Sequence, residues 1–361
     1  MTNSDQKLYL FIGSYAEAEG PGVYVYELDE SSGGLNRLQE VKGLKNPTFL
    51  NVDAKGKKLY SISETLSESG KRIGECVAFS INGSTGQLAE LNREINLDNT
   101  LCHIQRDEPY DYAIVSSYHG GKIGLIKLQE DGKLGILTDA KHHEAAERHA
   151  KDAVSHVHSA YFSPDKRFLF VNDLGLDFVR AYKLDAEQGK LVFHGDTVTA
   201  EGAGPRHLVF HPSEPYAFVI NELNSTIASY RYDGEAGTLT EIQSVSTLPA
   251  GYEGDNATAE IAVSKDGRFL YGSNRGHDSI VILSIDTSTG GLSVVDCVST
   301  EGSHPRHFAL TPDGAFLVAA NRDTNNLTVF RVDQASGKLQ YTGVSETVSK
   351  PVCVQPVYIQ A

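Results

Sequence analysis

The stretch HPRHFALTPDGAFLVAANRDTNNLTVFRVDQASGKLQYT, residues 304–342, decides the fold of this chain, because residues 204–242 repeat its pattern as GPRHLVFHPSEPYAFVINELNSTIASYRYDGEAGTLTEI. Both stretches end just after a Gly-x-Leu turn. The leucine of this turn recurs 46 to 57 residues apart, at Leu35, Leu88, Leu134, Leu191, Leu239, Leu292 and Leu339. A period of this size indicates repeated supersecondary units.

Each repeat has the pattern of four short strands. In the last repeat they are RHFAL, AFLVAA, LTVFRV and KLQYTG, separated by Pro-Asp-Gly, Asn-Asn and Ser-Gly turn signals. Four antiparallel strands repeated around an axis describe the blade of a propeller. The sequence therefore predicts an all-β, seven-bladed β-propeller that spans residues 1–361 as a single domain.

The two chain ends predict how the ring closes. The first repeat begins with LYLFIGSY, which resembles a second strand, and the missing first strand matches PVCVQPVYI from Pro351. We expect the C-terminal strand to be the innermost strand of the first blade, which removes an open sheet edge. Residues 1–6 (MTNSDQ) are polar and are expected to be disordered.

The amino-acid composition restricts the kinds of partner that this protein is expected to bind. The net charge is −15, which argues against nucleic acid, because phosphates require a basic surface. It allows a small anionic substrate, since a local arginine cluster can reverse the sign inside a pocket. The sequence contains no apolar stretch of membrane-spanning length and no signal-peptide pattern, so we expect a cytoplasmic protein without membrane partners. The oligomeric state stays open.

No cofactor is expected, since P-loop, dinucleotide and Gly-x-Ser-x-Gly motifs are absent. The four cysteines have neither metal nor redox spacing, and we expect buried, reduced thiols. A metal site would be the main competing role for the histidines of residues 141–159, KHHEAAERHAKDAVSHVHS. Their spacing matches no ligand motif, so we expect a polar, partly helical connector and no metal.

Antiparallel pairing brings the start of each innermost strand and the end of each second strand to the same face. The sequence places charged and polar residues there instead of simple turn residues: His156, His158, Arg206, His207, Glu260, Arg306 and His307 at innermost-strand starts, and Asp173, Glu222, Asn274, Arg275 and Asn321 at second-strand ends. Arginine recognises carboxylate or phosphate, and histidine transfers protons near neutral pH. The alternatives to a functional role are that the Arg-His pairs form a solvated loop edge, that Asp173 forms an Asx-turn and that Glu222 is a surface carboxylate.

At these motifs the chain resembles the lactonase family of seven-bladed propellers, which includes 6-phosphogluconolactonase and carboxy-cis,cis-muconate lactonising enzyme. The resemblance rests on HVHSAYFSPDKRFLFVNDLGLD, GPRHLVFHPSEPYAFVINELNST, EIAVSKDGRFLYGSNRGHDSI and HPRHFALTPDGAFLVAAN. It implies four active residues: His158, Arg206, Glu222 and Arg275. Arg322, where an uncharged or acidic residue is expected, departs from the pattern.

The resemblance implies a hydrolase that opens a sugar-acid lactone, with 6-phosphogluconolactone as the expected substrate. In this hypothesis His158 or Glu222 activates water, and Arg206 and Arg275 hold the carboxyl oxygen and the anionic group. The residues expected to bind substrate are His156, Asp173, His207, Asn274, Arg306, His307 and Asn321. The alternatives are a muconate-type cycloisomerase and a propeller that only binds a partner protein.

Overall fold

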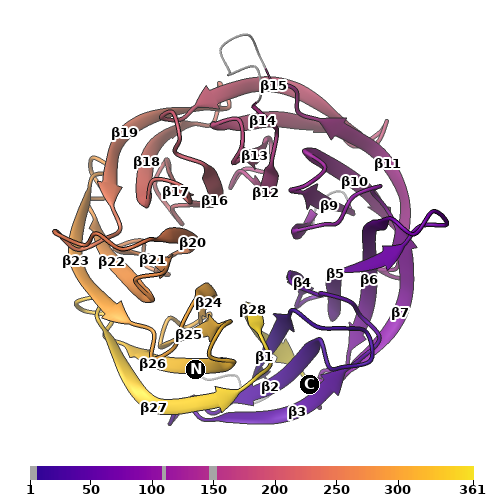
Figure 1. Ribbon diagram of the computed structural model, residues 1–361, viewed down its shortest axis with the longest axis horizontal. Helices are drawn as coiled ribbons and strands as arrows, with labels where there is room; N and C mark the ends of the chain where they lie inside the picture. The colour runs from indigo at the N-terminus through magenta and orange to yellow at the C-terminus, as the bar shows by residue number, and fades with distance from the viewer. Residues whose placement is uncertain (1–5, 108–110, 146–152) are drawn as a thin grey trace.

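The structure is a computed structural model that describes residues 6–107, 111–145 and 153–361. All its elements are β-strands, arranged as seven four-stranded antiparallel sheets around a central channel (Figure 1). The predicted seven-bladed propeller is therefore confirmed. The connector of residues 141–159 contains no helix in its described parts, 141–145 and 153–159, and its residues 146–152 lie outside the described residues, so the expectation of partial helix stays a prediction.

The blades share one order of strands from the channel outward. The innermost strands are β28 (Pro351–Gln360), β4 (Leu50–Asp53), β8 (His103–Asp107), β12 (Val157–Phe162), β16 (Pro205–Phe210), β20 (Ala257–Val263) and β24 (Pro305–Leu310). The second strands are β1 (Gln6–Ser14), β5 (Lys58–Leu66), β9 (Tyr112–Ser117), β13 (Leu169–Asp173), β17 (Tyr216–Asn221), β21 (Phe269–Arg275) and β25 (Phe316–Asn321).

The third and outermost strands complete the blades. The third strands are β2 (Val23–Leu28), β6 (Arg72–Ile81), β10 (Lys122–Leu128), β14 (Phe178–Asp185), β18 (Thr226–Asp233), β22 (Ser279–Ile285) and β26 (Asn326–Val332). The outermost strands are β3 (Leu35–Val41), β7 (Leu88–Ile95), β11 (Leu134–His142), β15 (Lys190–Val198), β19 (Thr238–Ser246), β23 (Leu292–Ser299) and β27 (Leu339–Thr347).

The recurring Gly-x-Leu turn marks the start of every outermost strand. In all seven turns the glycine has a positive φ, for example 66° at Gly237 and 72° at Gly337. A Cβ at Gly237 would lie 2.3 Å from the ring of Phe168 on the preceding blade, and one at Gly337 would lie 2.5 Å from Phe269. Glycine is required here by both backbone conformation and packing between blades.

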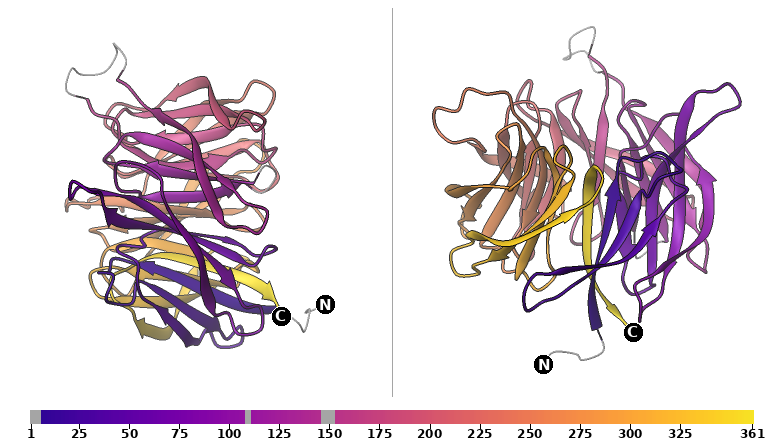
Figure 2. Two further views of the ribbon diagram at one scale, coloured as in Figure 1. Left: turned by 90° about the vertical axis from the view of Figure 1, so that its right-hand side faces the viewer. Right: turned by 60° about the horizontal axis from the view of Figure 1, so that its bottom comes forward.

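Ring closure follows the prediction. Strand β28 pairs with β1 from Gln6↔Gln360 to Ser14↔Pro351, so the first blade contains strands from both ends of the chain (Figure 2). Gln6 is part of β1, which corrects the expectation of disorder for that residue; residues 1–5 lie outside the described residues. The hydrophobic core is divided into seven clusters, each shared by two neighbouring blades.

Candidate active site

Beta-bulges place three of the predicted site residues. Val157 pairs with Asp173 and Ser159 pairs with Asn172, which leaves His158 as an extra residue in β12. Strands β16 and β24 have the same irregularity, and their extra residues are Arg206 and Arg306. A bulge redirects a side chain and breaks the strict alternation of faces. Consecutive residues can then both face the channel, and sequence periodicity alone does not predict this.

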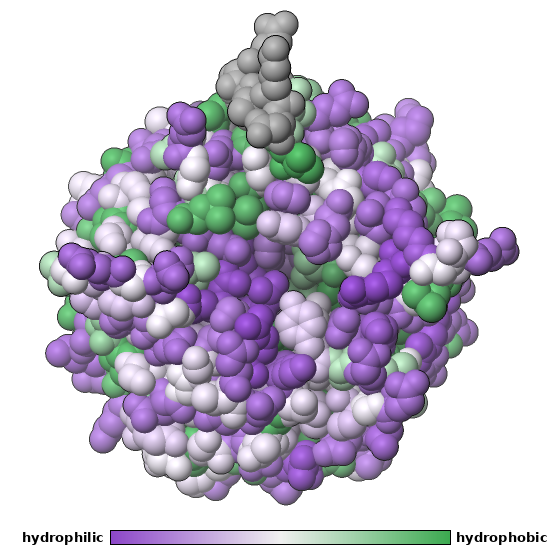
Figure 3. All heavy atoms as spheres, in the orientation of Figure 1, coloured by the Kyte–Doolittle hydropathy of each residue, from purple (hydrophilic) through white to green (hydrophobic). Residues whose placement is uncertain are grey.

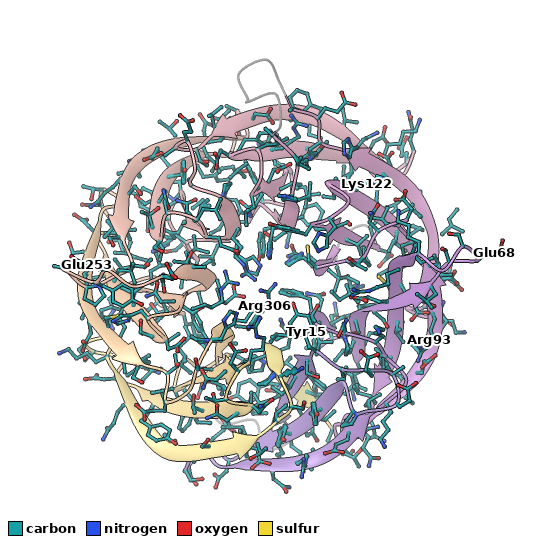
Figure 4. The ribbon with its side chains drawn as sticks, in the orientation of Figure 1. Tyr15, Glu68, Arg93, Lys122, Glu253 and Arg306 are labelled. Atoms are coloured by element: carbon teal, nitrogen blue, oxygen red, sulfur yellow. The ribbon has the colours of Figure 1, made fainter. Side chains whose placement is uncertain are left out.

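These bulges surround a cavity of about 330 Å³ at one mouth of the channel. Hydrophilic residues dominate around the hollow at the centre of this face (Figure 3), and Arg306 and Tyr15 extend toward the channel axis (Figure 4). The cavity is lined by Tyr15, Thr48, Phe49, Glu64, Arg72, Thr100, Leu101, Cys102, Tyr118, His119, His158, Arg206, His207, Glu222, Arg306, His307 and Val352.

Glu222 is held between two arginines. Its Oε2 lies 3.0 Å from Nε of Arg206 and 2.8 Å from Nη2 of Arg275. Burial alone would raise the pKa of Glu222, but the charges of Arg275, Arg206 and Arg306 outweigh it, so the pKa is lowered. Glu222 is therefore a carboxylate near neutral pH and a weak proton acceptor.

The three arginines near Glu222 differ in how far their N–H groups remain available to bind a substrate. Arg275 donates from Nη2 to the carbonyl oxygen of Thr258, and burial followed by the charge of Arg206 lowers its pKa to about 9. Arg206 donates from Nη1 to the carbonyl oxygen of Ala259. Its Nε is buried without a hydrogen bond, although it lies 3.0 Å from Oε2 of Glu222, and within residues 6–107, 111–145 and 153–361 Arg306 has no hydrogen-bond or ion-pair partner. Arg306 is thus available to bind an anion.

His158 borders the cavity with a nearly buried ring, 4% exposed. Burial, together with the nearby charge of Arg206, lowers the pKa of His158 well below its usual value. Its imidazole is therefore neutral at physiological pH and can accept a proton.

The cysteine at this cavity is unsuited to nucleophilic catalysis. Cys102 lines the cavity, but its Sγ contacts the carbonyl oxygen of His158 at 3.1 Å, and burial raises its pKa to about 12. A thiol in this state is a poor nucleophile. The four cysteines are free, as expected; Cys76 and Cys353 are buried, whereas Cys102 and Cys297 are only half-buried.

Three of the predicted substrate-binding residues lie in the blades instead of at the cavity. Asp173, Asn274 and Asn321 have 0% exposure and are absent from the cavity lining. Asn274 binds Thr247, and Asn321 donates to the carbonyl oxygen of Thr300. Their assignment to substrate binding is wrong, because their side chains are fully buried within the blades.

Asp173 is the central acceptor of a buried hydrogen-bond network. Its Oδ2 contacts Nδ1 of His143 at 2.9 Å and accepts the hydroxyl hydrogen of Ser155, and its Oδ1 accepts the backbone N–H groups of His156, Gly175 and Leu176. The last two bonds are those of an Asx-turn, the alternative noted from the sequence.

The predicted contacts of three histidines also need correction. His156 stacks on Tyr118 with ring centroids 4.2 Å apart and supports the cavity wall without lining it. His207 and His307 border the cavity, but Nδ1 of His207 and Nε2 of His307 each lie 3.0 Å from the carboxylate of Glu260. Nδ1 of His307 accepts the backbone N–H of Val354. Both ring nitrogens of His307 are therefore directed at protein atoms.

Some lining residues were missed from the sequence. Phe49, immediately before β4, contacts the rings of His103, His207 and His307 and forms part of the cavity floor. The position of Phe49 just before an innermost strand could have identified it. The second blade, however, lacks the Arg-His pair that marked the corresponding positions of other blades.

Within the described residues, no group of three or more histidine, cysteine, aspartate or glutamate side chains is arranged to hold a metal ion. The same part of the chain contains no helix with the length and hydrophobicity of a membrane span.

Comparisons with known proteins agree with this architecture. Residues 9–356 match the model of the family described as lactonase, 7-bladed β-propeller. A 6-phosphogluconolactonase from Bacillus subtilis is 35% identical over 298 residues, which cover 82% of this chain and 83% of the relative.

Solved structures are similar over almost the whole chain. The periplasmic gluconolactonase of Pseudomonas aeruginosa has a TM-score of 0.89 and 30% identity, covering 97% of this chain and 99% of the other. A protein from Lactobacillus plantarum has a TM-score of 0.88 and 34% identity, covering 98% and 99%. The chain belongs to the lactonase family of seven-bladed β-propellers.

Proposed function

We propose that the protein hydrolyses a sugar-acid lactone, with 6-phosphogluconolactone as substrate and 6-phosphogluconate as product. One observation carries the proposal. In a chain with a net charge of −15, a single cavity is lined by a neutral histidine, by the ion pair of Arg206 and Glu222, and by Arg306, which has no ion-pair partner among the described residues. Arg275 contacts Glu222 without lining the cavity. The names of the B. subtilis relative and the P. aeruginosa neighbour support lactone hydrolysis.

In this proposal the phosphate binds to Arg306. Arg206 and Arg275 share the carboxylate of Glu222, so their charges are already partly neutralised. Arg306 has no such partner among the described residues, and it can approach a phosphate with its planar group of N–H donors. This revises the expectation that Arg206 or Arg275 binds the anionic group.

The chemical step uses His158 and Arg206. Neutral His158 accepts a proton from water, and the water oxygen attacks the lactone carbonyl carbon. The guanidinium of Arg206, which borders the cavity, stabilises the negative charge that develops on the carbonyl oxygen. The ring C–O bond then breaks, and the proton passes from His158 to the departing ring oxygen. Glu222 orients Arg206 and Arg275 and takes no proton, since its pKa is lowered.

The test is hydrolysis by the purified protein of 6-phosphogluconolactone, of glucono-1,5-lactone and of a muconate-type lactone, each corrected for spontaneous opening. We expect the highest kcat/KM with the phosphorylated lactone. Turnover of the muconate compound alone would favour a cycloisomerase, and turnover of none would contradict the proposal and favour a partner-binding propeller.

A cytoplasmic location stays a prediction from the sequence. The P. aeruginosa neighbour is described as periplasmic, so fractionation of the source cells is the direct test. Recovery of the protein with periplasmic markers would contradict the prediction.

A further inference from the structure

A buried carboxylate between two histidines lies directly beneath the proposed active site. Glu260 on β20 approaches Nδ1 of His207 on β16 and Nε2 of His307 on β24, both at 3.0 Å. The side chains of Glu260, His207 and His307 are 9%, 1% and 8% exposed. The three residues come from consecutive blades, and the proposed mechanism gives Glu260 no role.

Hydrogen bonding determines which ring nitrogens carry a proton. A carboxylate only accepts hydrogen bonds, so Nδ1 of His207 donates to Glu260 and Nε2 of His207 has a free lone pair. His307 accepts from the N–H of Val354 at Nδ1, 3.3 Å away, and its Nε2 lies 3.0 Å from Oε2 of Glu260. Burial lowers the pKa of His207 to about 4, so the ring stays neutral.

Near this group, Nδ1 of His103 and Nε of Arg206 are buried without a hydrogen bond to the described residues, and two further nitrogens on neighbouring strands share this state. One is Nε2 of His207 and the other is Nδ1 of His158 on β12. The two rings belong to neighbouring innermost strands and meet edge to face, with centroids 5.0 Å apart and an interplanar angle of 63°. Buried polar atoms are rarely left without hydrogen bonds, so these two orphaned atoms need an explanation. An acceptor at His207 complements a donor at His158.

We propose that Glu260 and His207 are positioning residues that keep His158 in the Nδ1–H tautomer, through one water that accepts from Nδ1 of His158 and donates to Nε2 of His207. The lone pair of His158 then lies on Nε2, the nitrogen that is not among the orphaned buried atoms. This is the atom that accepts the proton of the attacking water. The inference deepens the proposed lactonase function and rests on it for its catalytic meaning.

The proton path is balanced within one turnover. Water forms the new C–O bond and gives one proton to Nε2 of His158, while Nδ1–H remains bonded toward His207. When the ring C–O bond breaks, the same proton moves from Nε2 to the ring oxygen. Glu260 and His207 keep their protonation states and act only by orienting His158 and stabilising its transient positive charge, as the third member of a catalytic triad does.

The first test reads the tautomers directly and requires no activity. The ring nitrogens of ¹⁵N-histidine-labelled protein are examined by two-dimensional NMR, and the signals of His158 and His207 are assigned by their loss in His158→Asn and His207→Asn. We expect both rings to be Nδ1–H tautomers. An Nε2–H tautomer at His158 overturns the inference, whether or not the protein is a lactonase.

The second test uses Glu260→Met, which keeps the side-chain length but removes both acceptor oxygens. Without an acceptor at Nδ1, His207 should carry its proton on Nε2, and His158 should change to the Nε2–H tautomer. We expect kcat to fall on the order of 10²-fold, with KM within twofold of the parent. A kcat within threefold, or an equal effect on KM, contradicts the positioning role.

The control is Asp173→Asn, which alters the buried carboxylate–histidine pair of Asp173 and His143 away from the cavity. It should leave the NMR signals of His158 and both kinetic constants unchanged. If the parent protein has no lactonase activity, the proposed function fails, while the tautomer measurement still decides whether the relay exists. If Glu260→Met does not fold, the tautomers of the parent protein decide the question alone.

Discussion

Two buried carboxylate–histidine pairs lie in neighbouring parts of the ring, and they differ in how completely they are hydrogen-bonded. In the pair of Asp173 and His143, Nδ1 of the histidine contacts the carboxylate and Nε2 contacts the hydroxyl of Tyr182 at 3.0 Å. In the pair of Glu260 and His207, Nε2 of the histidine and Oε2 of the carboxylate are buried without a hydrogen bond to any described residue. The first pair is saturated, whereas the second has an acceptor left over beside the cavity.

This difference distinguishes a buried polar network that stabilises the fold from one that can serve catalysis. A saturated buried network contributes rigidity, because every polar atom removed from water has a partner. A buried network with an orphaned acceptor costs stability and is retained where it serves a purpose such as catalysis. Residue type alone would have assigned both pairs the same role, and four predictions test the contrast.

The largest effect is expected for His158→Gln, which removes the proposed base. We expect kcat to fall by about 10²–10⁴-fold, the range associated with general base catalysis. The melting temperature should stay near that of the parent, because the ring borders the cavity. Parallel kinetics and thermal melts measure both; parental turnover by a folded variant would exclude His158 as the base.

The next effect is expected for Arg306→Gln, which removes the unpaired charge. Loss of a charge-assisted hydrogen bond costs about 1.5–3 kcal/mol, so kcat/KM for the phosphorylated lactone should fall about 10- to 100-fold, mainly through KM. Hydrolysis of glucono-1,5-lactone, which has no phosphate, should change less than threefold. Equal losses with both lactones would show that Arg306 does not bind the phosphate.

Asp173→Asn should show the opposite pattern. The amide cannot accept all the hydrogen bonds that converge on the carboxylate, so we expect a loss of about 1–3 kcal/mol in the free energy of unfolding. Because Asp173 is absent from the cavity lining, kcat/KM should stay within twofold. Denaturant titration and steady-state kinetics on the same preparation test this. An active-site role for Asp173 would be indicated by lost activity with unchanged stability.

The smallest effect is a displacement of the pH profile. Burial and the charges of Arg206, His207, Arg306 and His103 lower the pKa of His158 below the usual histidine value of 6.5. The base must be neutral to act, so kcat/KM should persist below pH 6.5 and decline only as the pH falls through this lowered pKa. A decline centred at or above pH 6.5 would contradict the environment assigned to His158.

Much of the molecule was predictable from local sequence. The Gly-x-Leu turns revealed seven blades because each turn needs a glycine with positive φ that packs on the preceding blade. The chain ends predicted the closing strand, since β1 lacked an inner partner within its own repeat. Positions at strand ends also brought His158, Arg206, Glu222 and Arg306 to one face, where the structure places all four around the cavity.

Other features were decided only by the tertiary structure. Strand position predicts the end of the blade at which a residue lies, but the bulges at His158, Arg206 and Arg306 determine which side chains face the channel. The partner of a buried polar group is equally nonlocal, because Glu260 is 53 residues from His207 in sequence. Sequence alone therefore identified the residues capable of acid–base chemistry. Contacts between blades determined that the carboxylate of Asp173 is fully hydrogen-bonded and that His207 has a free acceptor nitrogen beside His158.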